Sequence, residues 1–325
     1  MDNIKLVEQL NTARENLLRE IGQVIVGQKE ILEQLFMAML CRGHVLLEGV
    51  PGLAKTLIIK TLADVLDLSF SRIQFTPDLM PSDITGTEII QETSKGNRAF
   101  KFFKGPVFAN IILADEINRT PPKTQAALLE AMQEHSVTAA GTTYTLDEPF
   151  FVMATQNPIE QEGTYPLPEA QLDRFMFNLR IMYPDRADEI QIVNTTTSAP
   201  GGTPSKVITR EEIAAFQDLV HQIPVAENVV EYAVDLVRNS RPGPDNELKF
   251  IQQWVEWGAG PRASQYLILG GKVRAAFDGR TTPDFADITA MVKPVMRHRI
   301  ITNFNAEAEG VNTDTILDRL VQRRY

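Results

Sequence analysis

The spacing of apolar residues along the chain predicts helices and strands that alternate. Apolar residues recur at helical spacing over residues 4–20 and 29–40, and a further helix is expected over 57–66. Short apolar runs are typical of strands that are buried on both faces. Such runs, together with one alternating stretch at Phe70–Phe75, occur at Val45–Leu47, Ile111–Ala114, Phe150–Thr155 and Phe175–Ile181.

Strands that alternate with helices predict a parallel sheet covered by helices on both faces, an α/β fold. Two further pairs of short β-type segments interrupt this order. Glu88–Gln91 pairs with Ala99–Lys104, and Ser136–Ala139 pairs with Thr142–Leu146. Because a turn signal separates the members of each pair, we expect two inserted β-hairpins.

The pattern changes after a polar stretch with proline and glycine at residues 195–203. From Thr209 onward the apolar spacing is helical, with breaks at prolines and glycines and without a convincing strand. We therefore predict an α/β domain with N-terminal helices over residues 1–200 and a small all-α domain over 205–325. A length of 325 residues suits two domains, or one large domain with an appendage.

Composition limits where the protein works and what it binds. Hydrophobic residues make up 43% and charged residues 23% of the chain, which is ordinary for a globular protein. The net charge of −10 makes nucleic acid an improbable partner. Cys41 is expected to be a buried structural thiol, and no apolar run has membrane-spanning length, so we expect a cytoplasmic protein without membrane insertion. His298, between Arg297 and Arg299, is expected on a solvated helix face.

Residues 49–56, Gly-Val-Pro-Gly-Leu-Ala-Lys-Thr, give the strongest chemical signal. A strand is predicted before them and a helix after them, as in loops that cradle nucleotide phosphates with backbone N–H groups. Gly49 and Gly52 are expected to permit the bend because they lack Cβ. Ala54 replaces the last glycine of the usual pattern, a mild change provided that its φ is negative. The competing interpretation is an ordinary strand–turn–helix connection.

Asp115 and Glu116 follow the predicted strand Ile111–Ala114, at the end where open α/β sheets bind ligands. Together with the phosphate loop they predict a site for hydrolysis of a nucleotide. Lys55 would neutralise the β- and γ-phosphates, and Thr56 and Asp115 would hold Mg²⁺. Glu116 would polarise the attacking water. The alternative is a solvated acidic pair at a strand end.

Three more side chains are candidates for the same reaction. Asn157 follows the next strand and could hold the attacking water with Glu116, although Asn-Pro also favours a turn. Arg174 precedes the last strand and offers the forked guanidinium that stabilises charge on a γ-phosphate, with a salt bridge to Asp173 as the alternative. Arg262 would open a helix of the second domain, and its alternative is simple solvation.

In order, these positions resemble the Walker A, Walker B, sensor 1 and sensor 2 motifs of AAA+ ATPases. Over nearly the whole chain the sequence resembles the MoxR family of these ATPases. Ala54 departs from the general AAA+ pattern but suits this family. The stretches that carry the resemblance are Gly49–Thr56, Arg72–Asp78, Ala114–Arg119, Ala154–Pro158 and Gly163–Phe175.

The resemblance implies a fold, a nucleotide site and an assembly. The fold would be an AAA+ P-loop NTPase core with two inserted hairpins and a helical lid. The protein would form a ring, usually a hexamer, in which Arg174 is an arginine finger for the ATP of the neighbouring subunit. ATP would be expected rather than GTP, since no Asn-Lys-x-Asp motif is present. The implied contacts with the nucleotide are Val26, Gly27 and Gln28 at adenine and Gly49, Val50, Pro51, Gly52, Leu53, Ala54, Lys55, Thr56 and Leu57 around it.

The implied activity is ATP-driven, chaperone-like remodelling or activation of partner protein complexes. The partners often carry a von Willebrand factor A domain with a metal-dependent adhesion site. A chelatase-type or nucleic-acid motor of the same clade is the alternative, and the acidic net charge argues against DNA. A non-hydrolysing scaffold is a third possibility, but a scaffold has no need of Glu116, Asn157 and Arg174 together.

Overall fold

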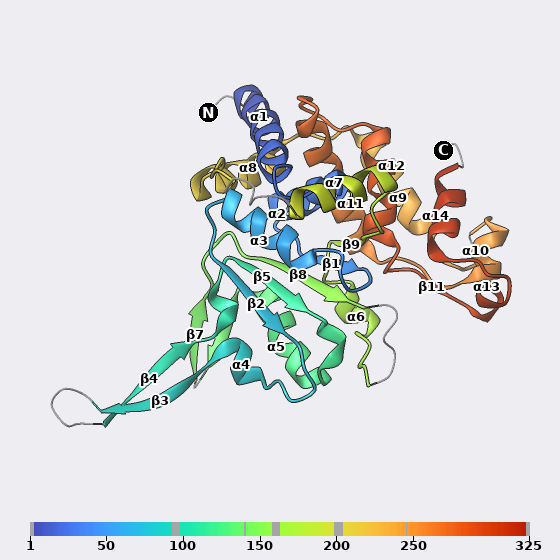
Figure 1. The fold of residues 1–325 in the computed structure, drawn as a ribbon. Coiled ribbons are helices and arrows are strands. Elements are labelled where there is room, and N and C mark those ends of the chain that lie inside the picture. The colour runs from blue at the N-terminus through green and yellow to red at the C-terminus, as the bar shows by residue number, and fades with distance from the viewer. Residues whose placement is uncertain are drawn as a thin grey trace.

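A central sheet of five parallel strands organises the molecule, as the sequence predicts (Figure 1). The structure is a computed structural model that describes residues 3–92, 98–139, 141–157, 163–197, 204–244 and 246–322. In spatial order the strands are β2 (Phe70–Gln74), β5 (Ile111–Asp115), β8 (Phe151–Gln156), β1 (Val45–Glu48) and β9 (Phe177–Arg180).

Alternate residues of each central strand enter two separate cores, because successive side chains of a strand point to opposite faces. Val45 and Leu47 of β1 belong to the larger core, whereas Leu46 belongs to the smaller one. Phe151 and Val152 of β8 divide in the same way. The sheet is therefore buried on both faces, which explains the continuous apolar runs in the sequence.

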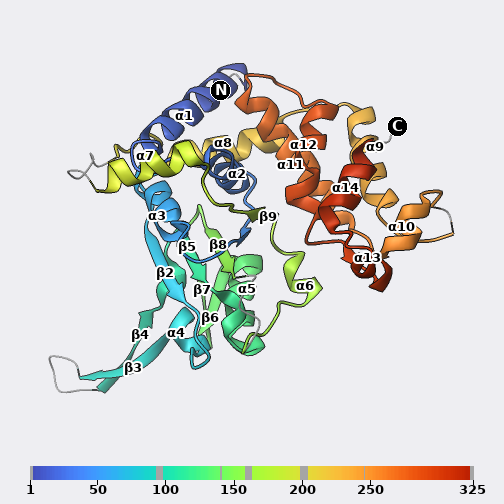
Figure 2. The ribbon, with the colours of Figure 1, turned by 45° about the vertical axis from the view of Figure 1, so that its right-hand side comes forward.

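Helices cover the two faces unequally (Figures 1 and 2). The larger core joins one face of the sheet to the N-terminal helices, α3 and the C-terminal helices, while α5 packs in the smaller core. The helices are α1 (Asn3–Ile21), α2 (Lys29–Leu40), α3 (Lys55–Val65), α4 (Pro81–Thr85), α5 (Pro122–Glu134), α6 (Glu169–Leu172), α7 (Arg186–Thr196), α8 (Arg210–Gln222), α9 (Glu227–Asn239), α10 (Lys249–Trp254), α11 (Pro261–Phe277), α12 (Phe285–Met296), α13 (Phe304–Ala308) and α14 (Thr313–Gln322), with 3₁₀ turns η1 (Pro106–Phe108) and η2 (Ile117–Arg119).

Both predicted hairpins are present. β3 (Gly86–Glu92) pairs antiparallel with β4 (Arg98–Lys104), and β6 (Ser136–Ala139) pairs with β7 (Thr142–Thr145). The predicted turn at residues 94–97 lies outside the described residues, as do residues 93 and 140. The first hairpin projects from the body of the molecule in Figure 1 and exposes Ile90 and Phe100, at 59% and 71%.

The C-terminal region is helical as predicted, with two differences. β10 (Val255–Trp257) and β11 (Ile301–Thr302) form a short antiparallel pair where no strand is predicted. The prediction of a solvated helix face at His298 is also wrong. This residue lies just beyond α12 and is half-buried, and burial lowers the pKa of its imidazole well below the usual range.

The predicted division at residues 200–205 stays a prediction. The polar stretch predicted as a linker begins later than expected, because α7 continues to Thr196. Residues 198–203 lie outside the described residues. No helix among the described residues is long and apolar enough to cross a membrane.

Cys41 follows α2 and is 4% exposed, as expected of a structural thiol. Burial raises its pKa far above the ordinary value, and only the thiolate is an efficient nucleophile. We therefore expect no reaction of the native protein with Ellman's reagent and the release of one equivalent after denaturation. Rapid stoichiometric labelling of the native protein would contradict this burial.

Candidate functional site

The loop between β1 and α3 has the predicted glycines, which act in two different ways. Gly52 has a φ of +88°, in the left-handed region that residues with a Cβ rarely adopt. Gly49 instead lies against Ile181, where an added Cβ would approach Cγ2 to 2.1 Å. The bend therefore depends on Gly52, whereas Gly49 is required by close packing.

Ala54 differs from the sequence expectation. It is the N-cap of α3 and has a φ of +53° and a ψ of 24°, so the condition of a negative φ, under which the replacement is mild, is not met. A left-handed backbone costs a residue with a Cβ about 1–2 kcal/mol. The left-handed turn nevertheless carries the loop directly into α3, where the first backbone N–H groups of a helix are available to an anion.

Asp115 ends β5 and is held on both carboxylate oxygens. Oδ1 accepts a hydrogen bond from Thr155 Oγ1 at 2.7 Å, and Oδ2 accepts one from Arg72 Nη2 at 2.6 Å. Its side chain is 13% exposed, whereas that of Arg72 is 47% exposed. The carboxylate is therefore fixed in place and can still be approached from the side of Arg72.

Glu116 follows in a left-handed conformation with a φ of +58°. Its backbone N–H donates to Thr155 Oγ1 at 2.9 Å. Its Oε2 accepts hydrogen bonds from Gln74 Nε2 and Arg119 Nη1, each at 2.9 Å. Two donors thus hold the Glu116 carboxylate, which the sequence analysis expects to polarise the attacking water.

Lys55 begins α3, and its Nζ donates to the Gly49 carbonyl at 2.5 Å. Burial lowers the pKa of this ammonium, while the nearby carboxylates of Asp115 and Glu116 oppose that shift. The charge of Lys55 therefore lies within the electrostatic reach of both acidic groups.

A cavity of about 490 Å³ brings most of the predicted catalytic residues together. It lies at the carboxyl edge of the sheet, where Asp115, Glu116 and Asn157 meet the loop before α3. Asn157 is 6% exposed, and Pro158 of the same motif lies outside the described residues. The lining residues are Pro51, Gly52, Leu53, Ala54, Lys55, Thr56, Leu57, Arg72, Gln74, Asp115, Glu116 and Asn157.

An apolar cavity of about 180 Å³ adjoins the first and shares Gly52, Leu53, Ala54 and Leu57 with it. It is also lined by Val26 and Gln28, both assigned to adenine in the sequence, and by Ile192 of α7. Gly27 lies beside the same helix, where an added Cβ would approach Asp188 Oδ2 to 2.4 Å. Val50 lines a third hollow with Gly49 and Tyr183. An apolar slot next to a polar cavity suits a base joined to phosphates.

The two predicted arginines lie elsewhere in the subunit. Neither Arg174 nor Arg262 is among the described residues that line the polar cavity. Arg174 Nη1 donates to the Leu129 carbonyl of α5 at 2.9 Å, so the structure does not show the alternative salt bridge with Asp173. Asp173 binds Arg262 instead, with 3.0 Å between Oδ2 and Nη1.

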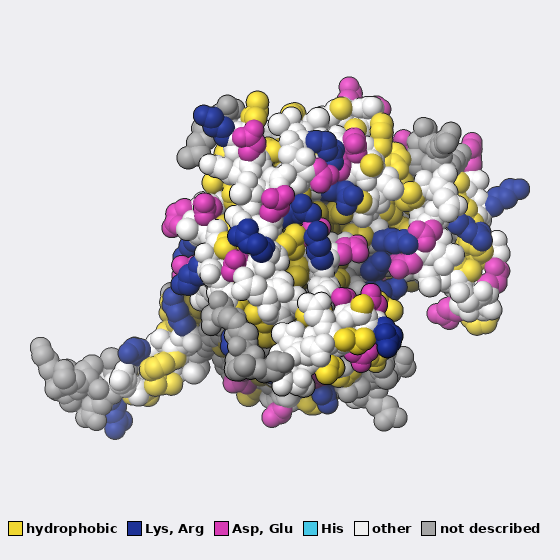
Figure 3. Space-filling view, turned by 45° about the horizontal axis from the view of Figure 1, so that its top comes forward, with side chains coloured by type: hydrophobic (Ala, Val, Ile, Leu, Met, Phe, Trp, Pro, Cys, Tyr) yellow, Lys and Arg dark blue, Asp and Glu magenta, His cyan; other side chains and the backbone are white. Residues whose placement is uncertain are grey.

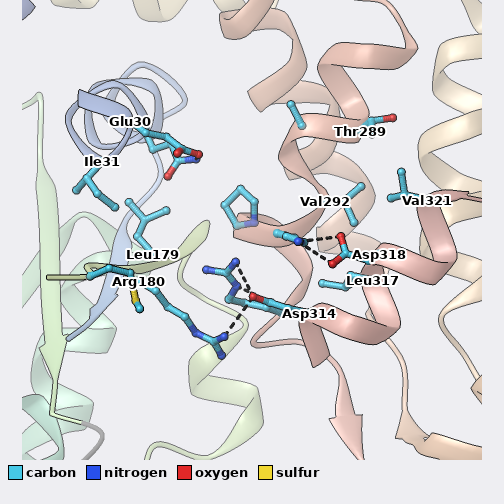
Figure 4. A pocket seen from close by; sticks show the side chains of 16 residues that line it. Glu30, Ile31, Leu179, Arg180, Thr289, Val292, Asp314, Leu317, Asp318 and Val321 are labelled. Carbon is cyan, nitrogen blue, oxygen red and sulfur yellow. Dashed lines mark hydrogen bonds and ion pairs between the residues drawn. The ribbon is translucent and has the colours of Figure 1, made fainter. Parts of the chain in front are cut away.

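A larger cavity of about 590 Å³ lies where α2 and β9 meet α12 and α14 (Figure 4). Asp314 lies between two guanidinium groups, Arg180 at 3.2 Å and Arg297 at 3.0 Å. Arg180 also binds Glu48, at the end of β1, at 3.3 Å. The charged groups named here are paired with one another, and the arrangement connects the C-terminal helices to the strand that precedes the phosphate loop.

Comparisons with known proteins agree with this geometry. Residues 44–177 match the model of the ATPase family associated with various cellular activities, and residues 249–320 match the AAA lid domain. The chain is 41% identical to Chaperone MoxR1 of Mycobacterium tuberculosis, over 95% of this chain and 81% of that protein. It is 31% identical to Protein MoxR of Methylorubrum extorquens, over 87% and 85%.

The chain belongs to the MoxR family of AAA ATPases.

A solved structure supports the same assignment for the MoxR-type fold. A putative ATPase from Cytophaga hutchinsonii aligns with a TM-score of 0.92 and 41% identity, covering 99% of this chain and 97% of that one. Family membership makes this MoxR-family protein an ATP-binding ATPase with a helical lid.

Sequence reasoning assigned no role in the site to Arg72 and Gln74, although both stand in a stretch that carries the family resemblance. They alternate with buried Ile73 at the carboxyl end of β2, and they hold Asp115 and Glu116. The sequence feature that could have identified them is this alternation, because polar residues two positions apart on a strand share one face. Their partners could not be identified without the strand order.

The strain at Ala54 can be measured. Ala54→Gly is expected to raise the free energy of unfolding by about 1 kcal/mol, because glycine adopts the left-handed region without the Cβ clash. Ala226 is also an N-cap, with a φ of −67°, so Ala226→Gly is a matched change without strain to relieve. Urea unfolding compares the two variants. An Ala54→Gly protein no more stable than Ala226→Gly would show that the loop stores no strain there.

Proposed function

We propose that this MoxR-family ATPase hydrolyses ATP in the polar cavity, with Glu116 as the group that polarises the attacking water. The observation that carries the proposal is the shared cavity of Lys55, Thr56, Asp115, Glu116 and Asn157. Water attacks the γ-phosphorus, the bond to the bridging oxygen breaks, and Glu116 accepts the proton of the water. Lys55 stabilises the phosphate charge, and Asn157 helps to orient the water.

Thr56 and Asp115 are proposed to hold Mg²⁺. The hydroxyl and the carboxylate line the same cavity, and no group of three or more His, Cys, Asp or Glu among the described residues forms a separate cage. That donor set fits Mg²⁺, which keeps several waters and binds through one or two protein groups together with phosphate oxygens. When bound, Mg²⁺ would neutralise charge on the β- and γ-phosphates. Because Thr155 and Arg72 already bind the two oxygens of Asp115, the carboxylate would share one of them with the metal or act through water.

The apolar cavity is proposed to receive adenine. Val26, Gln28 and Leu57 line it, and the four residues that it shares with the polar cavity support a base bound next to its own phosphates. ATP rather than GTP remains the expected nucleotide.

Arg174 is proposed to act on the ATP of a neighbouring subunit in a ring, for which a hexamer is expected, and Arg262 is proposed as the sensor 2 arginine. Neither is among the described residues that line the polar cavity of its own subunit: Arg174 binds Leu129, and Arg262 binds Asp173. Arg72 does line that cavity, but Asp115 binds its guanidinium at 2.6 Å. An arginine supplied in trans is a known way to complete such a site.

The proposed biological role is chaperone-like remodelling or activation of protein complexes, including partners with a von Willebrand factor A domain. Family membership supports client proteins. On the face shown in Figure 3, basic and acidic side chains are interspersed, which does not favour the alternative of a nucleic-acid motor. The exposed Ile90 and Phe100 make the first hairpin the proposed client surface.

Glu116→Gln is expected to keep ATP binding and to lower steady-state hydrolysis by about 10²–10⁴-fold, because an amide does not accept the proton. Lys55→Ala is expected to weaken binding itself. A fluorescent-nucleotide titration and a phosphate-release assay separate the two effects. The matched controls are Glu134→Gln at the exposed end of α5 and Lys60→Ala on the exposed face of α3, and both should resemble the wild type. Unchanged hydrolysis by Glu116→Gln would reject its role.

Arg174→Ala is expected to bind ATP normally and to hydrolyse it about 10³–10⁵-fold more slowly. Mixed with Glu116→Gln, it should regain activity, because some interfaces then pair an intact Arg174 with an intact Glu116. Phosphate release before and after subunit mixing measures the gain. Hydrolysis at full rate by a species that native mass spectrometry shows to be monomeric would exclude the trans role.

A further inference from the structure

Three consecutive lid residues, Arg297, His298 and Arg299, follow α12 and bind the backbone of β9 and of the segment that leads into it. Arg297 Nη1 donates to the Asn178 carbonyl at 3.3 Å, and His298 Nε2 donates to the Phe175 carbonyl at 3.0 Å. Arg299 Nη2 donates to the same Phe175 carbonyl at 2.6 Å. The lid thus holds the backbone of residues 175–178 from one short turn.

Arg299 also fixes Asp173, at the beginning of that segment. Its Nε donates to Asp173 Oδ1 at 2.7 Å and its Nη2 to the Asp173 carbonyl at 2.8 Å. The second carboxylate oxygen accepts from Arg262 Nη1, another lid group, at 3.0 Å. The side chain of Arg299 is 1% exposed, and the Tyr266 ring covers it at 5.2 Å. Because its acceptors are fixed, the planar guanidinium can make all of these hydrogen bonds in essentially one orientation.

Arg174 lies between these two anchored positions. Its neighbours Asp173 and Phe175 both bind Arg299, and α6, which precedes it, lies on the side of α5 that faces α13 (Figure 2). We infer that Asp173 is a positioning residue for Arg174 and that the lid residues Arg299 and Arg262 hold it in place. The lid of one subunit would then help to position the group that acts on the ATP of the next. This inference rests on the proposed trans role of Arg174.

The physical reason is the cost of separating buried charges. A lid movement that left Asp173 behind would leave the buried Arg299 without its carboxylate, which is strongly unfavourable. The segment is also fixed to the core, because the Met176 N–H donates to the His44 carbonyl at 2.8 Å and Phe175 is buried in the smaller core. The position of the Arg174 guanidinium therefore depends on both sides: the lid holds Asp173, and Arg174 itself binds Leu129 of the core.

The test begins with Asp173→Asn, which keeps the volume and removes the charge. We expect normal ATP binding and hydrolysis lowered by about 10²-fold, since small misplacements of a reacting group have effects of this size. Asp318→Asn is the matched control: it also removes the carboxylate partner of a lid cation, Lys293, at 2.8 Å, but does not contact the segment. It should behave as the wild type.

The decisive readout is which partner restores activity on mixing. Asp173→Asn subunits should be rescued by Glu116→Gln subunits, to about a quarter of the wild-type rate in randomly mixed rings, because one interface in four pairs both intact groups. They should not be rescued by Arg174→Ala subunits, since no interface would then have a well-placed finger. Rescue by Arg174→Ala only, or by neither, would overturn the inference.

Two further measurements keep the outcomes separate. If Arg174→Ala and Glu116→Gln do not rescue each other, the trans role itself fails, before any question about Asp173. If Asp173→Asn does not assemble, Arg299→Lys replaces it, because lysine keeps the buried charge but lacks the fork that joins Asp173 to Phe175. The same rescue pattern is expected for Arg299→Lys, and its absence in an assembled ring would refute the inference.

Discussion

Backbone hydrogen bonding between β5, β8 and β1 sets the spacing of the whole site. Ala114 pairs with Ala154, and Gln156 pairs with Glu48, so these strands run in parallel and their carboxyl ends lie along one edge of the sheet. The acidic pair, Asn157 and the phosphate loop leave the sheet at that edge. A slip of one residue in any strand would turn its side chains to the opposite face and separate the groups that must meet.

Much of this arrangement is readable in the sequence because it depends on local patterns. Apolar runs mark the buried strands, and the loop at residues 49–56 has a spacing that few other structures require. Contacts between distant residues are different. Arg299 binds Asp173 across 126 positions, and nothing in the pattern around either residue indicates the other. In the sequence, the three charged or polar side chains of residues 297–299 look solvated. The backbone carbonyls that accept their hydrogen bonds are known only from the structure.

The sign of the backbone angle φ cannot be read from the sequence either. Gln28, Ala54 and Glu116 are all left-handed, with φ of 56°, 53° and 58°, although none is glycine. At about 1–2 kcal/mol each, such conformations persist only where surrounding structure enforces them. All three line the polar or the apolar cavity. The backbone of the site is therefore strained at these three residues, and this conformation directs backbone and side-chain groups toward a ligand.

The larger core has a consequence for how the chain can be divided. Leu10 and Leu17 of α1 and Phe36 of α2 share one continuous apolar cluster with Leu267 of α11 and Leu320 of α14, and the Phe36 ring stacks on Phe277 at 5.7 Å. The two family-matched segments, 44–177 and 249–320, include neither α1 nor α2. A fragment cut at those boundaries would expose the apolar surface that the N-terminal helices cover. In engineering terms, the matched segments are regions of similarity, whereas the apolar core to which they contribute continues into the helices that precede them.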